Sequence, residues 1–256
     1  MTLAPDIGSP AHFGEAWDML FAPAIAHRGL WAPGGAPENS LAAFQAACAH
    51  GYGVELDVQL SADGEAMVFH DARLGRMTGA EGRLCDHSAA DLQGLRLAGT
   101  DETIATLADA LTLIGHRALV LIELKTPAGE VGPLERRVHE VLIDHNGPVA
   151  VIGFNPYSHA WLAKHHPQIL RGLDSYAYAD DASLAREQRK AYAQLEHVAL
   201  AKPHFLALGA DILPSKRATE LRARGMPVVA WTVRSGEQRT ALAPHSDNII
   251  FEGFAA

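Results

Sequence analysis

Residues 53–60 read Gly-Val-Glu-Leu-Asp-Val-Gln-Leu, and residues 119–124 read Leu-Val-Leu-Ile-Glu-Leu. Both are short apolar runs that contain carboxylates. Apolar runs of this length with polar ends are typical of strands buried on both faces, as in parallel sheets. Six further runs occur at residues 24–26, 149–154, 169–173, 205–208, 228–231 and 248–251. Eight strands are what a closed (β/α)8 barrel requires.

The segments between these runs have helical character. Residues 40–50 start at Ser40, a good N-cap, and are followed by Gly51, a good stop. Helices are also expected over residues 132–145, 156–165, 214–224 and 235–243, with Pro156 and Pro214 in first turns. Regular alternation of strands and helices predicts an α/β chain with a parallel sheet, namely a TIM barrel.

Residues 61–106 break this alternation. The pair Asp63-Gly64 is typical of a hairpin turn, so residues 53–60 and 65–70 are expected to pair as antiparallel strands. The segment is longer than an ordinary connection, and we interpret it as a small insertion after the second strand, over one mouth of the barrel. A length of 256 residues then suits a single barrel domain covering residues 1–256.

Composition narrows the class of function. The chain has 21 Lys+Arg against 30 Asp+Glu, a net charge of -9, which argues against a nucleic-acid partner. It leaves room for one phosphate in a locally cationic pocket. Two cysteines are too few for a zinc cluster. No run reaches the roughly 18 apolar residues of a membrane helix, and no Lys or Arg precedes Arg28 as a signal peptide requires. We therefore expect a cytoplasmic protein without a membrane anchor.

Carboxylates within the apolar runs are the strongest chemical signal. Glu55 and Asp57 are two residues apart and face the same side of one strand, and Glu123 and Lys125 repeat this spacing in the next run. Functional residues of parallel barrels gather at the carboxyl ends of strands. Buried carboxylates are costly unless they are paired or bind a cation, and oxygen ligands suit Mg²⁺ or Ca²⁺. The alternative is a structural ion-pair network inside the barrel.

Other candidates stand at the ends of the runs. His27 and Arg28 end the first run, His70 ends the hairpin strand and Trp231 ends the seventh run. Arg28 and Lys125, together with a divalent cation, would form a site for a phosphate anion. His27 and His70 could act as base and acid at neutral pH. Most of the 14 histidines are expected to have no such role, and Trp231 alone could be core packing.

Short motifs follow one another in a fixed order between about residues 24 and 251. They are His27-Arg28-Gly29, Pro37-Glu38-Asn39-Ser40, Glu55-Leu56-Asp57-Val58, Asp63-Gly64, His70-Asp71, Arg76-Met77-Thr78, Ile122-Glu123-Leu124-Lys125 and Trp231-Thr232-Val233. Their order and gaps resemble those of the glycerophosphodiester phosphodiesterase family. One such motif is a weak signal, whereas the ordered set is specific.

The resemblance implies a TIM barrel and a metal-dependent phosphodiesterase. Such an enzyme splits a glycerophosphodiester into glycerol 3-phosphate and an alcohol through a cyclic phosphate. It uses one divalent cation, for which Mg²⁺, Ca²⁺ and Mn²⁺ are the candidates. By position, the implied metal ligands are Glu55, Asp57 and Glu123, and the implied base and acid are His27 and His70. Arg28 and Lys125 would hold the phosphate, Glu38 would position Arg28, Asn39 would support the site, and Trp231 and Phe154 would flank the glycerol.

Two alternatives stay open. A phospholipase D-like relative would act on lysophospholipids or sphingomyelin and would need an apolar surface near the mouth. Residues 72–99 are polar and lack aromatic side chains, which favours a water-soluble substrate. A non-catalytic barrel that senses a phosphorylated ligand would have lost a histidine or a carboxylate, and here all are present. The last strand, at residues 248–251, departs from the family pattern, which bears on the choice of alcohol.

Overall fold

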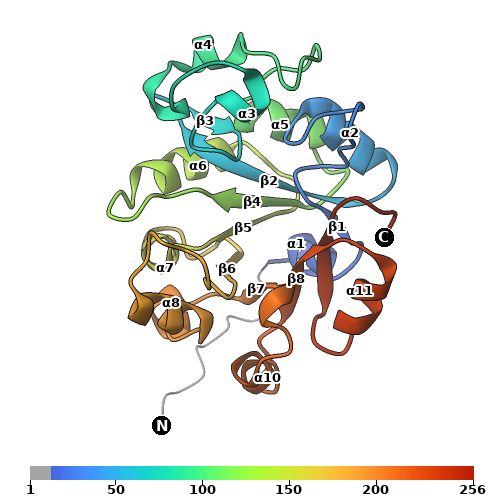
Figure 1. Cartoon of the computed structure of the whole chain (residues 1–256), viewed down its shortest axis with the longest axis vertical. Helices are drawn as coiled ribbons and strands as arrows, with labels where there is room; N and C mark the ends of the chain where they lie inside the picture. Colours follow the sequence, from blue (N-terminus) through green and yellow to red (C-terminus); the bar gives the residue numbers. More distant parts are fainter. Residues whose placement is uncertain (1–12) are drawn as a thin grey trace.

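The computed structural model describes residues 13–256, which form a closed parallel barrel with helices around it (Figure 1). The barrel strands are β1 (Ile25–Ala26), β2 (Gly53–Leu60), β4 (Val120–Leu124), β5 (Val149–Gly153), β6 (Arg171–Ser175), β7 (Phe205–Gly209), β8 (Val228–Val233) and β9 (Asn248–Phe251). The short β1 pairs in parallel with both β2 and β9, and this closes the barrel. The predicted TIM barrel is confirmed.

Helices follow the strands as the alternation predicts. They are α1 (Glu15–Leu20), α2 (Leu41–Ala49), α5 (Leu107–Ile114), α6 (Pro133–Ile143), α7 (Pro156–His165), α8 (Arg186–Ala193), α9 (Val198–Ala201), α10 (Lys216–Arg222) and α11 (Gly236–Leu242). Ser40 caps α2 by accepting a hydrogen bond from the Ala43 N–H. The prediction for Pro214 is wrong, because Ser215 is the N-cap of α10 and the proline precedes the helix. No helix within residues 13–256 is long and apolar enough to cross a bilayer.

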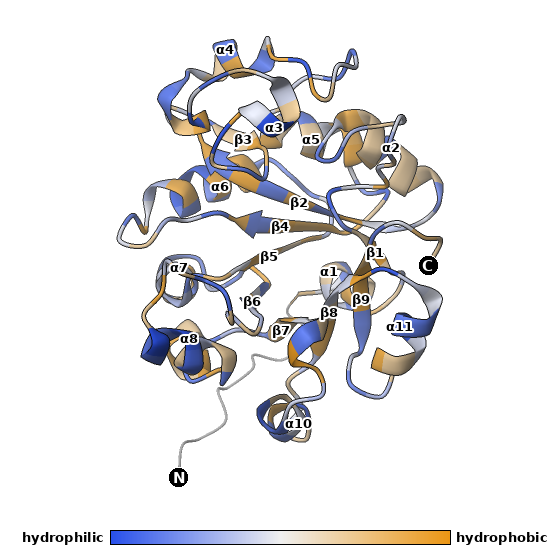
Figure 2. Ribbon diagram, in the orientation of Figure 1, coloured by the Kyte–Doolittle hydropathy of each residue, from blue (hydrophilic) through white to orange (hydrophobic). Residues whose placement is uncertain are grey.

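Two apolar layers hold the barrel together. The inner layer is formed by side chains such as Ile25, Leu121, Phe205 and Ile250, all of which are buried. The outer layer packs the other faces of the strands against the helices. Figure 2 shows the corresponding pattern, with largely orange strands inside and blue surfaces on α8 and α10. The strand core is therefore apolar on both faces, as parallel strands require.

The predicted insertion follows β2. It contains β3 (Ala66–Val68), α3 (Gly75–Thr78), a 3₁₀ turn (Leu84–Asp86) and α4 (Ala89–Gln93). Strand β3 pairs antiparallel with the end of β2, so the predicted hairpin is confirmed with a shorter second strand. A small core that includes Met67, Phe69 and Leu74 holds the segment together beside β2 (Figure 1). This packing fixes the position of His70, two residues beyond β3.

Strand β6 differs from its prediction. The apolar run at residues 169–173 predicts a strand that ends at Leu173, whereas β6 spans Arg171–Ser175. Leu173 packs outward in the layer against the helices, so Asp174 faces the barrel interior. The Ser175 hydroxyl donates to the Tyr192 carbonyl on the outer side. The apolar pattern stops before the strand does because the last two residues of β6 are polar. Asp174 faces the barrel interior, and Ser175 forms a hydrogen bond on the outer side.

Candidate active site

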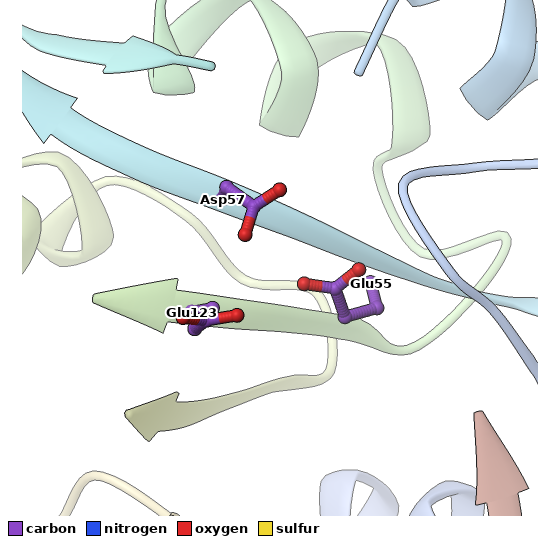
Figure 3. A group of neighbouring side chains, drawn as sticks. All are labelled: Glu55, Asp57 and Glu123. Atoms are coloured by element: carbon purple, nitrogen blue, oxygen red, sulfur yellow. The ribbon is translucent and has the colours of Figure 1, made fainter. Parts of the chain in front are cut away.

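Three carboxylates converge from two neighbouring strands of the barrel (Figure 3). Glu55 and Asp57 lie on β2, and Glu123 lies on β4 directly opposite Asp57 in the parallel register. One oxygen of each carboxylate lies within 4.8 Å of the others, and all three side chains are buried. The three side chains can meet because all of them point to the barrel interior. The two-residue spacing of Glu55 and Asp57 puts both on the same face of β2.

Two cations from the chain contact these carboxylates. The Lys125 Nζ lies 2.8 Å from Asp57 Oδ1 and 2.6 Å from Glu123 Oε1. The Arg28 Nε lies 3.3 Å from Asp57 Oδ2, and the Arg28 backbone N–H donates to Glu55 Oε2 at 2.8 Å. Gly29 follows in the left-handed region, with φ 79°, and a Cβ there would lie 2.9 Å from the Ala43 backbone. The glycine therefore lets this turn pack tightly against α2.

The pKa directions show that the negative charge is not fully compensated. Burial, followed by repulsion from Asp57, raises the pKa of Glu55 well above its usual value. Burial also raises the pKa of Glu123 to about 7, although Lys125 acts against it. Burial works on Asp57 as well, but there the nearby Lys125 and other cations outweigh it and hold the pKa far below its usual range. One more cation would relieve this imbalance.

A divalent cation fits these residues. Three carboxylates against two cations leave one negative charge, and Glu55 Oε1 has no hydrogen-bond partner within residues 13–256. All donor atoms are carboxylate oxygens, which magnesium and calcium prefer.

His27 is oriented by a carboxylate from the far end of the chain. Its Nδ1 lies 2.6 Å from Glu252 Oε2, and its Nε2 lies 4.0 Å from Glu55 Oε2. Glu252 also accepts from Arg234 Nε at 2.8 Å. The hydrogen bond with His27 lowers the pKa of Glu252 to about 2, so this group is ionised at neutral pH. Nδ1 is therefore assigned the proton, and Nε2 faces the carboxylates.

His70 has a similar arrangement in the insertion. Its Nδ1 lies 2.7 Å from Asp71 Oδ1, and its ring lines the same cavity as His27. Burial is the largest influence on His70 and lowers its pKa. Burial opposes the ionisation of Asp71, but hydrogen bonds from Arg76 prevail and lower its pKa to about 2. Each histidine thus pairs Nδ1 with an ionised carboxylate, which leaves Nε2 available for chemistry.

A chain of ion pairs connects His70 to the carboxylates. Arg76 binds Asp71 and also donates to Glu38 at 2.7 and 2.9 Å. Glu38 in turn accepts from Arg28 Nη1 at 2.8 Å. Asn39 completes the support, because its Nδ2 donates to Asp57 Oδ2 at 2.8 Å. Glu38 therefore lies beside Arg28, and Asn39 lies beside Asp57.

One cavity of about 610 Å³ is lined by both histidines, both cations, Glu55 and Glu123. Phe154 and Trp231 form its aromatic side, with ring centroids 5.6 Å apart at nearly a right angle. All eleven predicted site residues therefore gather at one barrel mouth, either on this cavity or directly behind it, as Glu38, Asn39 and Asp57 do.

The sequence prediction gives no role to several polar residues of the site. Asp71 and Arg76 lie inside quoted motifs but are given no role, and Glu252 follows the last strand. Asp174 lines the cavity, is only 3% exposed, and has no hydrogen-bond partner on either carboxylate oxygen within residues 13–256. Burial, then repulsion from Glu123, raises its pKa well above the usual value. The available signal for Asp174 is an acid that directly follows an apolar run.

Comparison with known proteins relates the chain to one family. The glycerophosphoryl diester phosphodiesterase family model matches residues 27–244. A glycerophosphodiester phosphodiesterase from Caldanaerobacter subterraneus is 35% identical over 161 residues, which are 58% of this chain and 65% of that protein. Glycerophosphodiester phosphodiesterase 1 of Mus musculus is 38% identical over 40% of this chain and 33% of its own length. The matches thus span less than two thirds of these two relatives.

Longer matches exist. YhdW of Bacillus subtilis is 31% identical over 232 residues, which are 85% of this chain and 87% of that protein. A phosphodiesterase of Oleispira antarctica, solved with the product sn-glycerol-3-phosphate, superposes with a TM-score of 0.78 at 27% identity, over 93% of this chain and 94% of that one. Together with the family match over most of the barrel, these likenesses show that the chain belongs to the glycerophosphoryl diester phosphodiesterase family.

Proposed function

We propose that this protein is a metal-dependent phosphodiesterase that hydrolyses glycerophosphodiesters to glycerol 3-phosphate and an alcohol. The observation that carries the proposal is the site itself. A buried three-carboxylate group and two histidines meet at one cavity, and each histidine has an ionised carboxylate on Nδ1. The product bound in the Oleispira antarctica relative supports the same substrate class.

Glu55, Asp57 and Glu123 would hold one divalent cation, Mg²⁺ or Ca²⁺, with Mn²⁺ as a further candidate. When bound, the cation neutralises negative charge on the phosphoryl group and makes phosphorus more electrophilic. Arg28 and Lys125 face the same cavity and would bind the remaining phosphoryl oxygens. A network of ion pairs alone does not account for the excess negative charge of these buried groups.

The histidines would move the protons. His27 Nε2 takes the proton of the glycerol hydroxyl that attacks phosphorus. His70 starts as the imidazolium, with protons on both ring nitrogens, and its Nε2–H protonates the alkoxide of the departing alcohol. A cyclic phosphate results. His70 then takes a proton from the attacking water, and His27 returns its proton to the glycerol oxygen. Both histidines end as they began, so the proton balance closes over the two steps.

The experiment follows product formation by phosphorus NMR with glycerophosphocholine as substrate. Chelator-treated protein is expected to be inactive, and Mg²⁺, Ca²⁺ or Mn²⁺ is expected to restore activity. Glycerol 3-phosphate should be the final product, with a cyclic phosphate before it in the His70→Ala variant if any turnover remains. Full activity after chelation, or choline phosphate as the product, would contradict the proposal.

A further inference from the structure

An aromatic groove of about 1580 Å³ adjoins the catalytic cavity, and we call it the tyrosine groove. Phe154 and Trp231 line both spaces, which therefore meet at this pair of rings. The groove continues over the loop after β6 and over α8. Side chains that line this outer part include Tyr157, Tyr176, Tyr178, Asp181 and Tyr192.

Aromatic rings form a continuous wall from the cavity outward. The Tyr176 ring centroid lies 5.7 Å from that of Phe154, 6.2 Å from that of Trp231 and 3.9 Å from that of Tyr178. Tyr178 in turn contacts Tyr192, with centroids 5.6 Å apart. Burial, with help from Asp181, raises the pKa of Tyr176 to about 12, so its ring is a neutral phenol at physiological pH. Such ring faces carry partial negative charge.

The charge of the tyrosine groove is negative. Within the part of the chain that the structure describes, Asp181 is the only carboxylate in the lining, and the lining contains no Lys, Arg or His. Its carboxylate accepts from the Tyr176 hydroxyl at 3.1 Å, and hydrogen bonds from Ser183 hold its pKa below the usual value. Arg189 is near Asp181 but does not belong to the lining, and its guanidinium donates to the Ala179 carbonyl. An anionic group is disfavoured here, and an acyl chain would bury an ionised carboxylate at high cost.

We propose that the tyrosine groove binds the alcohol half of the substrate and selects alcohols that carry a quaternary ammonium group. This inference rests on the proposed phosphodiesterase function. A phosphodiester has two organic arms, and only one of them can lie with its glycerol in the catalytic cavity. The other arm passes Phe154 and Trp231 into the groove. A quaternary ammonium has no N–H to donate, and it binds instead to aromatic faces, with Asp181 as a fixed counter-charge.

The charge requirement is tested with two substrates of the same shape. Glycerophosphocholine is compared with the glycerophosphodiester of 3,3-dimethylbutanol, in which carbon replaces the ammonium nitrogen. We expect kcat/KM to favour choline about tenfold, because a partly desolvated cation gains that much from an aromatic face. Equal values would overturn the proposal. So would a higher kcat/KM for lysophosphatidylcholine than for glycerophosphocholine, since the groove would then accept an acyl chain.

Variants locate the effect in the groove. Tyr176→Leu is expected to reduce the choline-to-dimethylbutanol ratio of kcat/KM to near one. The matched variant Tyr176→Phe keeps the ring and is expected to retain most of the ratio. Asp181→Asn should lower the ratio severalfold and weaken its dependence on salt. Because both substrates react at the same centre, a general loss of folded protein cancels in the ratio. An unchanged ratio in Tyr176→Leu would refute the proposal.

Direct binding separates this inference from the proposed function. Tetramethylammonium binding is measured by calorimetry on the wild-type protein and on Tyr176→Leu. Turnover of both test substrates at equal kcat/KM, without tetramethylammonium binding, leaves the phosphodiesterase function standing and overturns the groove proposal. If instead no glycerophosphodiester is hydrolysed with any metal, but tetramethylammonium binds in a Tyr176-dependent manner, the proposed function fails and the ammonium site is supported.

Discussion

At the barrel mouth, β2, β4 and the residues just after β1 and β4 carry charged side chains, whereas the segments after β5 and in β8 present the rings of Phe154 and Trp231. The charged side contains the carboxylates, Arg28 and Lys125, and nearly every charge there has an opposite partner at short range. The aromatic side contains one inward-facing carboxylate, Asp174, without a partner within residues 13–256. The difference indicates that the charged side serves the chemistry at the phosphoryl group and that the aromatic side recognises the organic part of the substrate.

The largest effect is expected on the charged side. Glu123→Gln removes one of three carboxylates and leaves Lys125 with an ion pair only to Asp57. We expect metal binding, measured by calorimetry with Mn²⁺, and hydrolysis to fall below detection. Asp101→Asn is the matched control, because Asp101 is an exposed acid paired with Arg96 on the surface. Retained metal binding in Glu123→Gln would break the assignment of the charged side.

Loss of either histidine should act on chemistry rather than on metal binding. His27→Ala and His70→Ala are each expected to lower kcat by about 10²- to 10⁴-fold, the range of general acid–base catalysis. The fold, followed by circular dichroism, and the Kd for Mn²⁺ should stay close to wild type. Near wild-type turnover in either variant with saturating metal would exclude that histidine from catalysis.

Removing an orienting carboxylate should have a smaller effect. Glu252→Gln keeps a hydrogen-bond acceptor for His27 but removes the charge that stabilises its protonated form. We expect kcat to fall about 10- to 100-fold, as for other groups that orient a functional histidine. The pKa of Glu252 is lowered in the folded state, so its stabilising effect is present above about pH 4.5 and is lost as pH falls toward 2. Wild type and variant should therefore converge in melting temperature at low pH.

Asp174 on the aromatic side, which has no partner among the described residues, is expected to affect the free energy of unfolding. Asp174→Leu is expected to stabilise the metal-free protein by about 1–3 kcal/mol at pH 7, because it removes a buried carboxyl without a partner. The pKa of Asp174 is raised in the folded state, so its cost is smallest below the usual pKa of aspartate and grows as pH rises. Denaturant unfolding at pH 4 and pH 7 measures this. A variant that is less stable than wild type at pH 7 would show that Asp174 has a partner in solution.

The sequence predicts the residues of the charged side, and on the aromatic side it predicts Phe154 and Trp231 but not Asp174. Glu55, Asp57 and Glu123 stand out because they are the only charged residues in strands that are otherwise largely apolar. Asp174 is hidden because it lies beyond an apolar run, so the pattern alone does not show that the strand continues.

Contacts between segments far apart in the sequence, and contacts between loops, also could not be predicted from the sequence. Glu252 meets His27 across 225 residues, and no local pattern encodes such a contact. The tyrosine groove has the same origin. Residues 72–99 lack aromatic side chains, but the segments after β5 and β6 and the helices α7 and α8 supply an aromatic surface near the mouth. Loops of different strands meet only in the folded barrel, so their combined surface is not visible in any one segment.

The two-residue strand β1 has a consequence for the order in which activity arises during synthesis. Every proposed metal ligand is translated by residue 123, but β1 gains its second neighbour only when β9 is made. The His27 N–H then donates to the Phe251 carbonyl, and Glu252 comes within reach of the imidazole. A nascent chain that lacks β9 therefore contains the metal ligands without an oriented base. We therefore expect late truncations that lack β9 to be inactive, because closure of the barrel also brings Glu252 to His27.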